Sequence, residues 1–90
     1  MVYTGFWPAE PNENCPDGQV VDTVSQCKKA LAQFGLRYFG TFTNNNRPAG
    51  CFRYKNNKSG RFNYNTDPAS TSPNKGTAGI CHPGIIALSI

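Results

Sequence analysis

The chain has few of the side chains from which catalytic sites are usually built. Its 90 residues include one histidine and five acidic residues, and no acid lies between residues 28 and 61. General acid–base catalysis needs paired titratable groups in one pocket, and the single histidine, His82, has no evident nucleophilic partner. We therefore expect a protein that is not an enzyme and that carries no cofactor.

The spacing of the cysteines argues against a metal site. Structural zinc sites use closely spaced pairs of Cys or His ligands, whereas Cys15, Cys27, Cys51 and Cys81 are separated by 12, 24 and 30 residues. An even number of cysteines in a short chain is typical of a disulfide framework formed in an oxidising compartment. We expect no metal and a secreted protein, either extracellular or in the lumen of an oxidising organelle.

Long apolar runs are also missing. A transmembrane helix needs roughly 20 apolar residues, and the apolar tail over residues 85–90 has only six. The first residues lack the basic and apolar regions of a signal peptide, which favours either a processed module or a chain whose leader is missing. We expect a chain that does not span a membrane.

One helix is predicted over residues 24–34. Thr23 is a suitable N-cap, with Gln26 as its capping-box partner, and Gly35 suits the position after the last turn. The apolar residues of this segment recur at helical spacing and form one stripe: Val24, Cys27, Leu31 and Phe34. Cys27 is therefore expected on the buried face of the helix.

Strands are predicted over residues 37–42, 51–54 and 61–64, with a short one at 20–21 and a hairpin turn over 55–60. Alternation places Cys51 and Arg53 on one face of their strand. Phe52 and Tyr54 lie on the other face, where they need a second cover or form a binding surface. The expected fold class is α+β: a small disulfide-stapled domain in which one helix packs on a short antiparallel sheet.

We divide the chain as one domain, 1–90, with an extended N-terminal segment (1–14), a disulfide module (15–81) and an apolar C-terminal tail (82–90). The segments that carry a family resemblance are Cys15-Pro16-Asp17-Gly18, Thr23–Cys27, Arg47–Phe52, Arg61–Asn65 and Ile80-Cys81. Their order resembles a small cysteine module of secreted and cell-surface proteins of microalgae and other protists. It is loosely similar to the apple/PAN class. The resemblance implies an extracellular or lumenal interaction module in which a helix is disulfide-linked to a small sheet.

We predict nested disulfides, Cys27–Cys51 and Cys15–Cys81. Cys27 faces inward from the helix, and Cys51 begins the strand expected beneath it. Cys15 and Cys81 flank the two ends of the module. On the chain-entropy view, bridges closing loops of this length each stabilise the fold by roughly 3–4.5 kcal/mol.

Charge is segregated along the chain. Residues 1–27 contain four acids and no Lys or Arg, and residues 28–61 contain eight bases. Such asymmetry can steer an anionic partner. The simpler alternative is that the acidic and basic segments pack against each other.

The function favoured by the sequence is a non-catalytic protein-interaction or structural module, part of a larger assembly or self-associating. Its interface would combine N-terminal aromatics with the tail: Phe6, Trp7, Ile85, Ile86, Leu88 and Ile90. The alternative is a carbohydrate-binding, lectin-like module that uses exposed aromatics and Asn side chains. Its candidate ligand-binding residues are Phe52, Tyr54, Phe62, Tyr64, Arg53 and Arg61. Nucleic acid is not expected as a partner, and Asn57 is a candidate glycosylation site.

Overall fold

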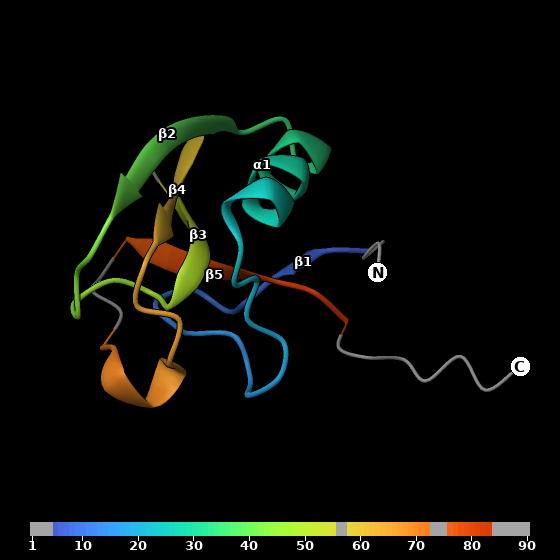
Figure 1. Ribbon diagram of the computed structural model, residues 1–90. Coiled ribbons are helices and arrows are strands. Elements are labelled where there is room, and N and C mark those ends of the chain that lie inside the picture. The colour runs from blue at the N-terminus through green and yellow to red at the C-terminus, as the bar shows by residue number, and fades with distance from the viewer. Residues whose placement is uncertain (1–4, 56–57, 73–75, 84–90) are drawn as a thin grey trace, which may run out of the picture.

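The computed structural model describes residues 5–55, 58–72 and 76–83. In this part of the chain, five strands form one sheet in the order β1-β5-β3-β4-β2, and one helix packs on one of its faces (Figure 1). The strands are β1 (Trp7–Pro8), β2 (Arg37–Phe42), β3 (Gly50–Tyr54), β4 (Ser59–Asn63) and β5 (Thr77–Cys81). The fold is therefore a small α+β domain, as predicted.

The helix, α1 (Val24–Gln33), begins at the predicted cap. The Thr23 hydroxyl accepts a hydrogen bond from the Gln26 backbone N–H at 3.2 Å, which satisfies one of the free donors of the first turn. At the other end Gly35 has φ 68°, and the Leu36 N–H donates back to the Leu31 carbonyl at 2.8 Å. This closure lets the chain reverse directly into β2.

The sheet is mixed rather than wholly antiparallel as expected. Strands β3 and β4 form the predicted antiparallel hairpin, with Arg53 opposite Gly60, but β2 pairs in parallel with β4. The chain reverses twice between β2 and β4, so these two strands run in the same direction. Strand β2 then pairs with the free edge of β4. The register shifts between Tyr38 and Thr41, where Gly40 has φ 120°, a conformation that favours glycine.

Both predicted disulfides are confirmed. Cys27–Cys51 joins α1 to β3, Cys15–Cys81 joins the loop between β1 and α1 to β5, and no described cysteine is free. Each bridge lies in its own hydrophobic cluster. The larger cluster lies between α1 and the sheet, and the smaller one surrounds Cys15 and Cys81 together with Ala9, Val20 and Ala49.

Asn63, at the end of β4, joins this strand to the loop between β2 and β3 through its buried side-chain amide. Its Nδ2 donates to the carbonyls of Asn44 (2.7 Å), Pro48 (3.0 Å) and Arg47 (3.4 Å). Its Oδ1 accepts from the backbone N–H groups of Asn44 and Asn65, both at 3.1 Å. The amide therefore supplies hydrogen bonds to backbone groups of the loop that links β2 to β3, as a neighbouring strand would.

Replacing Asn63 with Ala should be strongly destabilising, because buried carbonyls lose their donors. We expect the free energy of unfolding to fall by about 3 kcal/mol, measured by urea denaturation with the disulfides intact. Asn65→Ala is the matched control, since its amide bonds to Asn45 at the surface, and it should cost less than about 1 kcal/mol. Equal losses for the two variants would contradict this role of Asn63.

His82 is buried just after β5, where its backbone N–H donates to the Gln19 carbonyl. Burial lowers the pKa of its imidazole below the usual 6.5, against smaller raising effects of Asp22 and of a hydrogen bond with the Val20 backbone. The native state therefore binds this proton less readily than the unfolded chain does. It follows that the histidine costs stability as the pH falls through 6.5.

The unfolding free energy should accordingly be lower at pH 5.5 than at pH 7.5. His82 is the only histidine of the chain, and histidine is the side-chain type whose charge usually changes in this pH range. His82→Gln should remove most of the difference, as measured by denaturation at the two pH values. An NMR titration of the imidazole checks the cause independently. An imidazole pKa at or above 6.5 would contradict it.

Candidate functional site

The face of the sheet opposite the helix, called the outer face here, carries a row of aromatic rings. Cys51 is bonded to the helix, so alternation along β3 turns Phe52 and Tyr54 to the outer face. The ring of Phe52 stacks on Phe42 of β2, with centroids 5.7 Å apart, and meets the edge of Tyr54 at 5.3 Å. The rings of Phe42 and Tyr54 therefore provide the cover that Phe52 needs.

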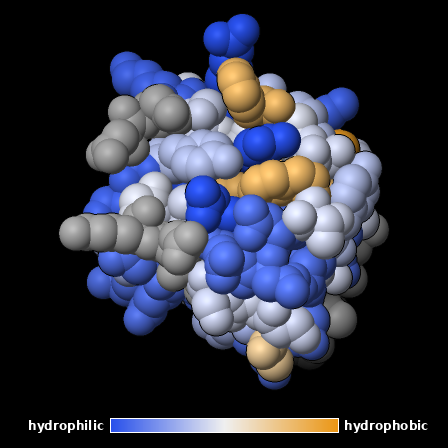
Figure 2. All heavy atoms as spheres, turned by 90° about the vertical axis from the view of Figure 1, so that its left-hand side faces the viewer, coloured by the Kyte–Doolittle hydropathy of each residue, from blue (hydrophilic) through white to orange (hydrophobic). Residues whose placement is uncertain are grey.

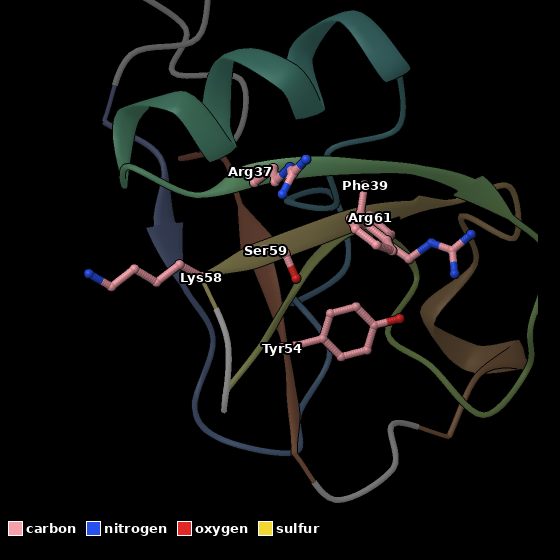
Figure 3. Close-up of a pocket in the computed structure, with 6 residues that line it drawn as sticks. All are labelled: Arg37, Phe39, Tyr54, Lys58, Ser59 and Arg61. Atoms are coloured by element: carbon pink, nitrogen blue, oxygen red, sulfur yellow. The ribbon is translucent and has the colours of Figure 1, made fainter.

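A cavity of about 640 Å³ opens beside this row. Its lining residues come from β2, from β3, from β4 and from the residue just before β4: Arg37, Phe39, Tyr54, Lys58, Ser59 and Arg61. Figure 3 shows the side chains of Lys58 and Arg61 extending in opposite directions, with Ser59 between them and Tyr54 below. We call this hollow the outer-face cavity.

Phe39 is the most exposed large hydrophobic side chain among the described residues, at 61%. It comes from β2, the edge strand, and borders the cavity with Tyr54. Figure 2 views the side of the molecule that carries β2 and shows apolar groups interleaved with strongly polar ones. A surface of this kind offers rings and hydrogen-bond donors at the same place.

Arg61 is held in position by the aromatic row. Its guanidinium lies 4.1 Å from the centroid of the Phe42 ring, a distance at which cation and ring attract each other. One of its terminal nitrogens, Nη2, donates to the Thr41 carbonyl at 3.3 Å. These two contacts fix the side chain along the sheet before any ligand binds.

The cavity is cationic. Arg37, Lys58 and Arg61 line it, and none of its described lining residues is Asp or Glu. A second cavity, of about 410 Å³, has the opposite character: the residues described around it include Asp17, Asp22, Asp67 and His82, but no Lys or Arg. The described part of the chain contains no group of three or more His, Cys, Asp or Glu side chains arranged to hold a metal ion.

The candidate ligand-binding residues are divided between the two faces of the sheet. Tyr54 and Arg61 line the outer-face cavity, and Phe52 is fully buried beneath it. Phe62 pairs with Cys51 and packs in the helix-side core. Tyr64 is 60% exposed, but its ring contacts that of Phe62 at 5.8 Å.

Arg53 also belongs to the helix side. It lies opposite Gly60, where an added Cβ would collide with Leu31 of the helix. Four lining residues were not predicted from the sequence: Arg37, Phe39, Lys58 and Ser59. Alternation along residues 37–42 does put Arg37 and Phe39 on one face. Only the parallel pairing of β2 with β4 places them beside Arg61.

The proposed interface residues at the N-terminus are part of the fold. Phe6 is 7% exposed and belongs to the helix-side core, and half-buried Trp7 pairs with Cys81 and packs on the smaller cluster. Neither offers a large free apolar surface. The tail residues Ile85, Ile86, Leu88 and Ile90, and the candidate glycosylation site Asn57, lie outside the described residues.

Within the described ranges, no helix has the length and apolar character needed to cross a bilayer. Comparison of the chain with models of protein families, with curated proteins and with solved structures gives no match. The resemblance to the cysteine modules of protists therefore stays a prediction, and the outer-face cavity is the main indication of function.

Proposed function

We propose that this protein is a non-catalytic carbohydrate-binding module that acts in an oxidising compartment and binds its ligand in the outer-face cavity. The observation that carries the proposal is the exposed ring of Phe39, which borders a cavity shared with Tyr54, Ser59 and three cationic side chains. The apolar C–H faces of sugars pack on aromatic rings, and sugar hydroxyls accept hydrogen bonds from guanidinium groups. Two disulfides in a small domain fit such a compartment.

Assembly with another protein through Phe6, Trp7 and the tail is the alternative. The packing of Phe6 and Trp7 within the domain weighs against it. Burial of Phe6 in the core satisfies its hydrophobic surface within the domain. Trp7 is partly covered by the cluster around Cys15 and Cys81. An interface built on this end would therefore depend mainly on the tail.

Phe39→Ala should reduce carbohydrate binding at least tenfold, because it removes one of the two rings of the cavity. That loss corresponds to about 1.4 kcal/mol. The measurement is a glycan array followed by calorimetric titration with the best oligosaccharide. Tyr64→Ala is the matched control: its ring is equally exposed, at 60% against 61%, but lies on the helix side. It should change the affinity less than twofold.

A chain that ends at Pro83 separates the two functions. It retains every lining residue of the outer-face cavity, so carbohydrate binding should be unchanged. Light scattering on the full and shortened chains tests the alternative. An oligomer that dissociates on truncation, together with an array that shows no binding, would replace the proposal with the assembly function.

A further inference from the structure

We infer that the ligand of the outer-face cavity is a polyanionic glycan, a chain of sugars that carries sulfate or carboxylate groups. This inference rests on the proposed function and specifies its substrate class. Three of the six described lining residues are cationic, and none of these six is acidic. A cavity for neutral sugars would usually also offer carboxylate or amide acceptors to the sugar hydroxyls, and the six described lining side chains include neither.

The arrangement of the cations indicates an extended anion rather than a single compact one. Arg37 begins β2, opposite Ser59 of the parallel strand β4, and Arg61 lies two residues further along β4. Standard strand spacings put the Cα atoms of Arg37 and Arg61 roughly 8 Å apart. In Figure 3 Lys58 extends to the far side of Ser59 from Arg61. A lone phosphate would need these groups to converge on one point, whereas a chain with repeated charges can meet them in succession.

The preorganisation of Arg61 fits the same ligand. Its stacking on Phe42 and its bond to the Thr41 carbonyl fix the plane of the guanidinium. A planar, fixed guanidinium loses little conformational entropy when it binds a carboxylate or sulfate through two parallel hydrogen bonds. Arg61 is thus the anchor, and Arg37 and Lys58 extend the contact along the chain of sugars.

Single-stranded nucleic acid is also bound by aromatic rings in basic grooves. Two observations favour a glycan. The disulfides fit a compartment in which nucleic acid is an uncommon partner. The rings of Phe42 and Phe52 stack on each other within the fold. Phe39 and Tyr54 are the rings that line the cavity, and two rings do not form a continuous platform for a series of bases.

The test compares dextran sulfate with neutral dextran, which has the same backbone, and adds polygalacturonate and an oligothymidylate of similar length. Calorimetric titrations of the full chain at 50 mM and 500 mM NaCl should give at least tenfold tighter binding to dextran sulfate or polygalacturonate than to dextran. The high salt concentration should weaken that binding strongly, because it screens exposed charges.

A charge-matched pair of variants shows where the polyanion binds. The double variant Arg37→Gln/Lys58→Gln should lose at least tenfold in affinity for the preferred polyanion. Lys28→Gln/Lys29→Gln removes the same charge from the exposed side of the helix and should lose less than threefold. Arg61→Lys, which keeps the charge but not the planar donor pair, should bind more weakly than the parent chain. Thermal melts verify that each variant is folded.

Each other outcome overturns the inference in a recognisable way. Equal binding of neutral and charged polymers, with no effect of Arg37→Gln/Lys58→Gln, refutes the anionic substrate class and leaves the proposed function standing. Equal losses for the two double variants reveal attraction by net charge without a site. Tighter binding of oligothymidylate than of every glycan identifies a nucleic-acid ligand. No binding of any carbohydrate, here or on the array, refutes the proposed function itself.

Discussion

The Cys27–Cys51 disulfide determines which face of the sheet is buried and which is exposed. It ties α1 to Cys51 near the start of β3. Because side chains alternate along a strand, Phe52 and Tyr54 then point away from the helix. The face that the helix covers becomes the main core. On the other face the segment around Cys15 covers Gly79 and Cys81 of β5. Phe52 is buried on that face under two neighbouring rings, and a cavity opens beside them.

The parts of the fold that local patterns specify were predictable. The capped helix and the β3–β4 hairpin follow from residues that are close in sequence. The Cys27–Cys51 pairing follows from the faces on which these cysteines lie, and the Cys15–Cys81 pairing from their positions at the two ends of the module. The pairing of β2 with β4 was not predictable, because it joins strands far apart in sequence and depends on which sheet edge is free. For this reason Tyr54 and Arg61 were identified in the candidate site, whereas Arg37 and Phe39 were missed.

Phe6 and Trp7 illustrate a second limit of sequence reasoning. Aromatic residues next to a chain end resemble an exposed interface, and nothing local distinguishes that role from a place in the core. A domain of this size has few aliphatic side chains to bury, and here Phe6 joins Leu31 and Ile80 in the core. The hydrogen bond from the Gln33 side chain to the Phe6 carbonyl, at 3.1 Å, holds this segment on the helix.

The charge segregation of the sequence persists in space. Among the described residues, three bases of the 28–61 segment line one cavity, whereas Asp17 and Asp22 of the first segment line the other together with Asp67. Grouping like charges around the outer-face cavity costs some electrostatic free energy in the unbound protein, because the cations repel one another. An anionic ligand relieves that repulsion on binding, whereas a neutral one leaves it in place. The cationic residues whose mutual repulsion costs free energy in the unbound protein therefore favour the binding of a negatively charged ligand.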